Sequence, residues 1–227
     1  EVLNKLNQAI VELKGHKPID YIINQSVFYG REFYVDESVL VPRSETEELV
    51  QWILEREETE GKTILDIGTG SGCIPITLFL EGKFSKVDAT EVSQSATKTA
   101  IKNAELLKAK IEVEVHDILT QVPKELYDIV VSNPPYVKRE ELEALDKNVI
   151  EYEPVIALAP ESDDPLLFYI RMVEIAPKMI KPKGILYWEI HEDLGPECVA
   201  ILEGGGFEQV ELKEDIYGRN RMIRAVL

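Results

Sequence analysis

From Gly61 onward, stretches with the pattern of a buried strand alternate with stretches of helical period. The predicted strands span residues 63–67, 86–90, 111–116, 127–132, 184–189, 208–214 and 220–226. The predicted helices span residues 73–81, 95–108, 166–180 and 193–203. Such alternation is typical of a mostly parallel sheet with helices on both faces. The sequence therefore predicts an open, doubly wound, seven-stranded α/β fold that ends in an antiparallel hairpin, with its ligand at the carboxyl ends of the strands.

The part of the chain before this alternation has a different pattern. Apolar residues recur at helical spacing over residues 1–14, and the pattern stops at Gly15. Residues 27–41 alternate and are interrupted at residues 29–32, which predicts a small β-hairpin. A further helix is predicted to begin at Ser44. Because the chain begins with a residue other than Met, we expect a segment before it.

The charge of the chain limits the partners that it can bind. Its 25 Lys and Arg residues against 42 Asp and Glu residues give a net charge of −17. Such a field repels phosphate backbones, so it argues against non-specific binding to nucleic acid. No apolar run reaches the roughly 18 residues of a membrane span. We therefore expect a soluble, cytoplasmic protein without a membrane partner.

Cysteine and histidine residues do not form a metal-binding pattern. Cys73 and Cys198 lie far apart and lack the spacing of a metal site, so they are expected to be buried thiols in a reducing compartment. His16, His116 and His191 are also scattered. We expect no metal and no chemistry driven by histidine.

A glycine-rich turn follows the first strand of the alternating region. Its residues are Gly68, Thr69, Gly70, Ser71 and Gly72. Glycines allow a ligand to approach bare backbone, and the next helix offers unpaired N–H groups. The spacing is G-x-G-x-G rather than the G-x-G-x-x-G of dinucleotide sites, which disfavours nicotinamide cofactors. Glu91 ends the second strand, where a carboxylate can accept both hydroxyls of a ribose. Singly, these residues could be a tight turn and a solvated strand end; together they favour a ligand of the adenosine type.

Two more acidic residues stand near this predicted site. Asp117 ends the next strand, where it could accept a hydrogen bond from an exocyclic amine while Ile118 packs on a purine face. Asp66 precedes the glycine turn and could accept hydrogen bonds from the N–H groups of the turn or from a ligand ammonium. Both uses of Asp66 are compatible.

The most specific motif is Asn133-Pro134-Pro135-Tyr136, which follows the strand at residues 127–132. Two prolines stiffen the loop, which any protein could use as a rigid turn. An amide or aromatic amine is a poor nucleophile because its lone pair is delocalised. The Asn133 side-chain oxygen and the Pro134 carbonyl could accept its two N–H bonds and direct the lone pair at a methyl donor. Tyr136 could stack on the planar group, and no strong base would be needed.

The chain resembles the class I S-adenosylmethionine-dependent methyltransferases, and more closely the peptide chain release factor glutamine N5-methyltransferases, over about residues 16–227. The resemblance is carried by residues 18–22, 28–30, 39–47, 68–72, 133–136, 152–154, 157–158 and 215–221. It implies a Rossmann-like domain at residues 44–227, a β-hairpin connector at 23–43 and a remnant of an N-terminal helical domain at 1–22. There are departures: residues 159–165 differ from the Gly-Gly-x-Asp-Gly stretch common in the family, and residues 189–191 read Glu-Ile-His rather than Glu-Ile-Gly. We expect these departures to alter loop geometry and not the reaction.

The resemblance implies a function and a set of site residues. The reaction is transfer of a methyl group from S-adenosylmethionine to a glutamine side-chain amide in the Gly-Gly-Gln loop of a release factor, which leaves S-adenosylhomocysteine. The implied cofactor-binding residues are Gly68, Thr69, Gly70, Ser71, Gly72, Glu91, Asp117, Ile118 and Asn133. Asp66 is added as a candidate because of its position before the turn. The implied catalytic residues are Asn133, Pro134 and Tyr136. The implied substrate-binding residues are Asn133, Pro134, Pro135, Tyr136, Arg43 and Glu45.

Some alternatives remain open at this point. Ser44 and Glu47 have capping-box spacing that would start a helix whatever the function, while the resemblance places Arg43 and Glu45 beside the site as a lid. Glu153 is equally ambiguous. The same motif could methylate an exocyclic amine of adenine or guanine in RNA or DNA, but the net charge favours a protein substrate. A non-catalytic adenosine-binding module would leave the Asn133 motif unexplained. We expect a monomer that binds release factors and makes no direct contact with nucleic acid.

Overall fold

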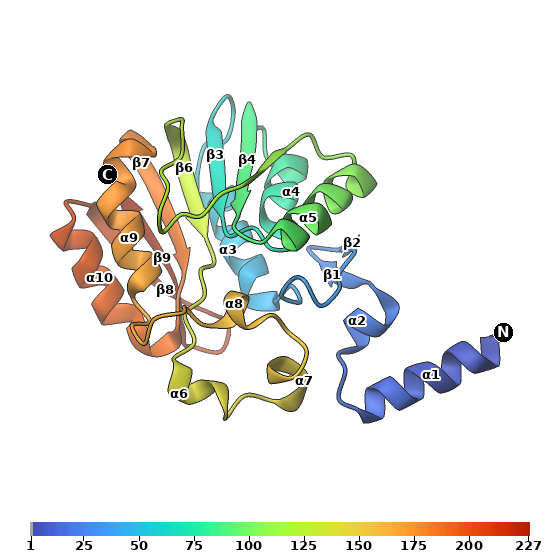
Figure 1. Ribbon diagram of the computed structural model, residues 1–227. Coiled ribbons are helices and arrows are strands. Elements are labelled where there is room, and N and C mark those ends of the chain that lie inside the picture. The colour runs from blue at the N-terminus through green and yellow to red at the C-terminus, as the bar shows by residue number, and fades with distance from the viewer. Residues whose placement is uncertain (1) are drawn as a thin grey trace.

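A computed structural model describes residues 2–227, and its centre is a seven-stranded sheet (Figure 1). Across the sheet the strands are ordered β5-β4-β3-β6-β7-β9-β8. Their bounds are β3 Thr63–Ile67, β4 Lys86–Glu91, β5 Glu112–Val115, β6 Tyr127–Ser132, β7 Ile180–Glu189, β8 Glu208–Glu214 and β9 Asn220–Val226. The strands from β5 to β7 pair in parallel, whereas β9 pairs antiparallel with both β7 and β8. The doubly wound sheet with an antiparallel C-terminal hairpin is therefore confirmed.

Helices cover both faces of this sheet. The larger ones are α3 Ser44–Arg56, α4 Cys73–Glu81, α5 Gln94–Leu107, α9 Leu167–Ile175 and α10 Gly195–Gly204. In Figure 1, α4 and α5 lie on one side of the strands, while α9 and α10 lie on the other. A sheet with helices on both faces buries successive strand residues in opposite directions. In β6, Ile129 and Val131 pack into the core under α3 and α4, and Val130 packs into the core under α9 and α10.

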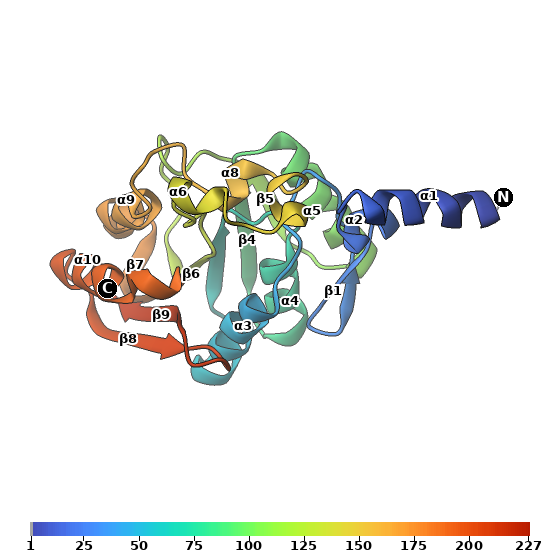
Figure 2. The same ribbon diagram turned by 90° about the horizontal axis from the view of Figure 1, so that it is seen from below.

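The N-terminal segment lies beside this body. Its elements are α1 Val2–Lys14, α2 Ile19–Ile23, β1 Ser26–Phe28 and β2 Arg31–Phe33, the last two forming a small antiparallel sheet. Figures 1 and 2 both show α1 projecting away from the sheet. Phe28 and Phe33 are fully buried and join the core under α3 and α4, so the hairpin is fixed to the body by its aromatic residues.

Three short helices follow β6 and lie across the carboxyl ends of the strands. They are α6 Arg139–Leu142, α7 Lys147–Ile150 and α8 Val155–Leu158. Figure 2, which views the molecule from that side, shows α6 and α8 in front of the sheet. A backbone hydrogen bond from Val137 N–H to Leu158 O closes the base of this segment at 2.9 Å. The sequence did not predict these helices, each of which has only one turn.

Several predicted boundaries were wrong, and a proline explains one of them. The helix predicted at residues 166–180 ends at Ile175, because Pro177 lacks the N–H group that would continue it, and a 3-10 turn, η1 Ala176–Lys178, follows. The strand predicted to begin at residue 184 begins at Ile180, and its register shifts before residue 185. The helix predicted at residues 193–203 is a 3-10 turn, η2 Glu192–Leu194, followed by α10. The hairpin predicted over residues 27–41 has strands only to Phe33.

Within residues 2–227, no helix has the length and hydropathy needed to cross a membrane.

Candidate active site

A cavity of about 260 Å³ opens at the carboxyl ends of the central strands. It lies where β3 and β6 are neighbours, the point at which the strand order reverses and where ligands bind in open α/β sheets. Its lining includes the glycine turn after β3 and residues at the ends of β4 and β6. Residues 38–43 and 154–161 contribute further lining from outside the sheet. The cavity therefore lies between the sheet and segments that are distant in sequence.

The glycine turn is held by hydrogen bonds to its neighbouring strand. The N–H groups of Gly68 and Thr69 both donate to Thr90 O, at 2.9 and 3.0 Å. Gly68 and Gly70 have φ values of 75° and 55°, and a Cβ atom at either would meet nothing within 4 Å. A side chain there would point into open space while straining the backbone. The turn thus presents bare backbone to the cavity, as the sequence predicts.

Asp66 is a buried carboxylate whose two oxygens lack a hydrogen-bond partner. Of its two expected uses, the hydrogen bonds from the N–H groups of the turn are not formed: Gly68, Thr69 and Gly70 donate to β4, and Gly72 donates to Thr69 O. Burial, partly offset by the nearby Thr69 hydroxyl, raises the pKa of Asp66 to about 7. Asp66 lies behind the cavity wall and does not line it.

Two other carboxylates are fixed at the strand ends. Glu91 accepts the N–H of Gly70 at 2.9 Å and the N–H of Ser93 at 3.0 Å. Asp117 accepts the N–H of Leu119 at 3.0 Å and the Thr120 hydroxyl at 2.8 Å. Both residues line the cavity. Each carboxylate oxygen can accept a second hydrogen bond, so both groups remain able to bind a ligand.

Asn133 follows β6 and lines the cavity with Pro134 and Pro135. Its side-chain Nδ2 donates to Thr46 Oγ1 at 3.2 Å, and the Thr46 hydroxyl donates to Glu189 Oε2 at 2.6 Å. The Tyr136 hydroxyl donates to the other oxygen, Glu189 Oε1, at 3.1 Å. Glu189 on β7 thus holds Tyr136 directly and Asn133 through Thr46. Tyr136 does not line the cavity itself.

Sequence analysis missed Glu189 and Thr46. Both are buried, with 1% and 3% of their surfaces exposed. Burial raises the pKa of Glu189, against the opposing effects of its hydrogen bonds with Thr46 and Tyr136 and of the Arg221 charge. Within residues 189–191 only His191 departs from the family pattern, while Glu189 agrees with it and supports the motif. The only sequence signal for Thr46 is its place in residues 39–47, one of the segments that carry the family resemblance.

The segment before α3 is held by an ion pair. Arg43 Nη2 lies 2.5 Å from Glu153 Oε1, and Glu153 Oε2 accepts the Val41 N–H at 3.2 Å. Arg43 lines the cavity, whereas Glu45 does not. The predicted capping box is wrong: α3 has no side-chain cap, because Glu47 instead accepts the Tyr29 N–H at 2.7 Å.

Histidine is closer to the site than the sequence suggested. His116 lines the cavity after β5, which β4 and β3 separate from β6, and its Nε2 is buried without a partner among the described residues. His191 lies against the Tyr136 ring, with the ring centroids 6.0 Å apart.

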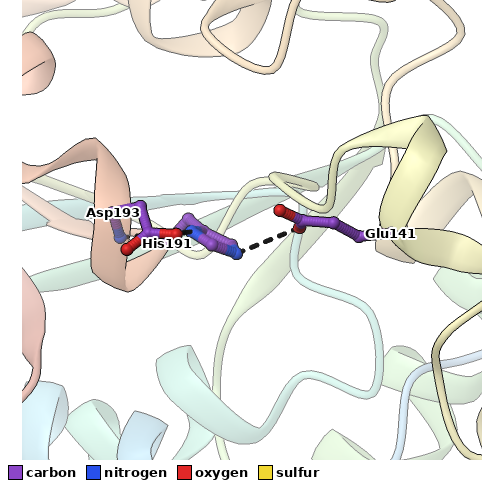
Figure 3. A group of neighbouring side chains, drawn as sticks. All are labelled: Glu141, His191 and Asp193. Atoms are coloured by element: carbon purple, nitrogen blue, oxygen red, sulfur yellow. Dashed lines mark hydrogen bonds and ion pairs between the residues drawn. The ribbon is translucent and has the colours of Figure 1, made fainter.

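His191 also forms a cluster with Glu141 and Asp193 (Figure 3). Its Nε2 lies 3.2 Å from Glu141 Oε2, while its Nδ1 accepts the Asp193 N–H at 3.2 Å. Figure 3 shows the two carboxylates on opposite sides of the imidazole. A metal ion needs lone pairs that converge on one point, so this arrangement is a link from α6 to η2 rather than a metal site.

Comparisons with known proteins identify the family. Residues 45–154 match the family model described as "Methyltransferase small domain". Over 221 residues the chain is 45% identical to a release factor glutamine methyltransferase of Flavobacterium psychrophilum, with 95% of this chain and 78% of that protein covered. The chain belongs to the release factor glutamine methyltransferase family. A second member, from Bacteroides thetaiotaomicron, is 39% identical over 97% of this chain and 80% of its own length. The resemblance stated from the motifs is thereby confirmed.

A solved structure agrees with this assignment at the level of the fold. A methyltransferase from Pyrococcus furiosus superposes with a TM-score of 0.63, at 19% identity, and covers 88% of this chain and 90% of that protein. In this member of the release factor glutamine methyltransferase family, the cavity gathers most of the predicted site residues. The predicted residues that line it are Arg43, Gly68, Thr69, Gly70, Ser71, Glu91, Asp117, Ile118, Asn133, Pro134 and Pro135. Those that do not are Glu45, Asp66, Gly72 and Tyr136.

Proposed function

We propose that this chain transfers a methyl group from S-adenosylmethionine to the side-chain amide nitrogen of a glutamine in the Gly-Gly-Gln loop of a peptide chain release factor. The observation that carries the proposal is the position of Asn133 and Pro134 on the wall of the cavity, at the end of β6. Membership in a family whose relatives are named for this reaction supports it.

The residues of the cavity fit the cofactor. The glycine turn offers an open backbone surface, which only residues without Cβ can present at these φ values. The anchored carboxylate of Glu91 would accept ribose hydroxyls, and Asp117 with Ile118 would hold the adenine. The unpaired carboxylate of Asp66 would supply negative charge behind the turn, toward a cationic ligand. When bound, S-adenosylmethionine supplies an electrophilic methyl group.

The motif would orient the acceptor amide. The Asn133 side-chain oxygen and the Pro134 backbone carbonyl accept the two N–H bonds of the glutamine amide, which directs the nitrogen lone pair toward the methyl group. The N-methylated amide cation is acidic enough to lose its proton without a strong base. Stacking of Tyr136 on the amide stays a prediction, since its hydroxyl is held by Glu189 behind the cavity wall.

The same chemistry would suit an exocyclic amine of adenine or guanine, so the choice of substrate depends on charge. A net charge of −17 disfavours the phosphate contacts that nucleic acids require. We therefore propose a release factor as the binding partner, a monomeric enzyme without direct contact to nucleic acid, and a cytoplasmic location. We also propose that residues 44–227 form the catalytic domain, with residues 23–43 as a connector and residues 1–22 as part of a helical domain.

The test is transfer of labelled methyl from S-adenosylmethionine. We expect label in a release factor, and none in a matched factor whose Gly-Gly-Gln glutamine is changed to Ala. The tRNA and rRNA samples, incubated in parallel, should stay unlabelled. Label that enters only nucleic acid would overturn the proposal in favour of the base methyltransferase.

A further inference from the structure

The orientation of the Asn133 amide decides whether the motif can work. An asparagine side chain carries an acceptor oxygen and a donor NH2 group of nearly equal shape, so its orientation must be set by hydrogen bonds. If the NH2 group faced the substrate, two donors would oppose each other. The proposed function therefore needs hydrogen bonds that keep Oδ1 of Asn133 on the substrate side.

The neighbours of Asn133 provide these hydrogen bonds. An ionised Glu189 only accepts hydrogen bonds, so the Thr46 hydroxyl must donate its single proton to Oε2, 2.6 Å away. The Thr46 oxygen can then only accept toward Asn133. It receives the Nδ2 group at 3.2 Å, which leaves Oδ1 without a partner among residues 2–227.

The second oxygen of Glu189 is also occupied. It accepts the Tyr136 hydroxyl, and the backbone carbonyl of Glu189 accepts the hydroxyl of buried Tyr169 at 3.1 Å. The Tyr136 bond holds the carboxylate of Glu189, and the Tyr169 bond holds its backbone. Because Glu189 and Thr46 are almost fully buried, water cannot readily replace either bond.

We propose that Thr46 and Glu189 are positioning residues that fix Asn133 with its side-chain oxygen toward the acceptor amide. They act through Asn133 and not on the reacting atoms. The inference rests on the proposed function and adds a specific cause for the selectivity of the site: it accepts a planar NH2 group and rejects a group that offers only an acceptor.

The test compares three variants that differ by a hydroxyl or a methyl group. Thr46→Val keeps the shape of the side chain and removes the hydroxyl, so we expect kcat to fall by about 10- to 100-fold, as for loss of a fixed hydrogen bond in a catalytic site. The Kd for S-adenosylhomocysteine should change by less than about threefold. Thr46→Ser restores the hydroxyl and should recover most of kcat. Thr77→Val is the matched control, because Thr77 is equally buried on α4 and its hydroxyl has no partner.

We call the hydrogen bonds that join Glu189, Thr46 and Asn133 the relay. A double-mutant cycle distinguishes loss of this relay from general destabilisation of the site. Glu189→Gln lets the new amide donate to Thr46, so the hydroxyl can turn toward Asn133 and reverse its amide. The Thr46→Val/Glu189→Gln double variant should therefore be no slower than the slower single variant. If the losses in kcat of the two single variants multiply in the double variant, the relay is wrong. It is also wrong if Thr46→Val and Thr46→Ser have equal kcat.

A readout without turnover keeps this inference distinct from the proposed function. In ¹H–¹⁵N spectra, we expect one Asn133 side-chain NH2 proton to be protected from exchange in the wild type and in Thr46→Ser, but not in Thr46→Val. If the wild type shows this protection yet does not methylate a release factor, the proposed substrate is wrong and the relay stands. If protection is absent in the wild type, the relay is wrong.

Discussion

At the scale of single residues, the site contains a polar group that costs the folded protein stability. Asp66 is buried without a hydrogen-bond partner, and burial raises its pKa to about 7. A buried polar group without a partner calls for a specific explanation, and a ligand that uses the group is one such explanation. We interpret Asp66 as a residue that helps to bind the cofactor and lowers the stability of the fold when no cofactor is bound.

This interpretation predicts how stability changes with pH. Because the folded-state pKa of Asp66 exceeds its ordinary value, its favourable contribution is complete below about pH 4 and is lost as pH rises toward 7. The Asp66→Asn variant lacks this titration. The unfolding free energy of the variant minus that of the wild type should therefore increase by about 2–4 kcal/mol as pH rises from 4 to 7.5.

Urea unfolding across this pH range measures the effect. Asp163→Asn is the matched control, since the Asp163 side chain is almost fully exposed. A difference between Asp66→Asn and the wild type that stays constant with pH would show that Asp66 does not carry the buried charge.

At the scale of elements, the sequence predicted the sheet well because strand burial follows from local pattern. The runs in β3 and β6 are apolar on both faces, as parallel strands between two helical layers require. The three helices from α6 to α8 could not be predicted, because each is one turn long and depends on distant contacts, such as that of Val137 with Leu158. The capping-box prediction failed for a similar reason: the Glu47 side chain serves the hairpin turn at Tyr29.

The last glycine of the turn is constrained by packing at the contact between α4 and α5. Gly72 has φ of 81°, and a Cβ atom there would lie 3.1 Å from Ile76 Cδ1 and 3.2 Å from Ala100 Cβ. Gly72 is thus a packing residue, which explains why it does not line the cavity although the motif includes it.

Gly72→Ala should lower the unfolding free energy by about 2–4 kcal/mol, since it adds overpacking between two helices to the strain of a positive φ. Gly61→Ala is the matched control: its φ is 75°, and its Cβ would meet nothing within 4 Å. That variant should lose only about 1 kcal/mol. Equal losses in urea unfolding would mean that the α4–α5 contact does not constrain the turn.

At the scale of the whole molecule, the site is assembled from segments that no local pattern connects. The polar chain at the motif joins Thr46 on α3, Asn133 after β6 and Glu189 on β7. Sequence motifs identified Asn133, but they could not show which distant side chains hold it. Contacts of this kind are set by packing of the complete fold, so Thr46 and Glu189 were found only in three dimensions.

The Arg43–Glu153 pair is the second long-range link, because it joins the segment before α3 to the segment before α8. The Glu153 side chain is 1% exposed, and its pKa is raised by burial in spite of the Arg43 charge. Arg43→Ala would leave this carboxylate buried without its counter-ion. We expect a loss of about 1–3 kcal/mol in unfolding free energy at pH 7, below the full cost of breaking a buried pair because Arg43 is 37% exposed.

Arg56→Ala is the matched control, since its pair with Glu211 is about half exposed on both sides and should contribute less than about 1 kcal/mol. The decisive variant is the double change Arg43→Ala/Glu153→Gln. If the loss in Arg43→Ala comes from an uncompensated buried charge, neutralising Glu153 removes that cost while an amide oxygen still accepts the Val41 N–H, and most of the stability returns. If the double variant is instead as unstable as Arg43→Ala, the arginine stabilises the two segments by packing, and the ion pair is not what joins them.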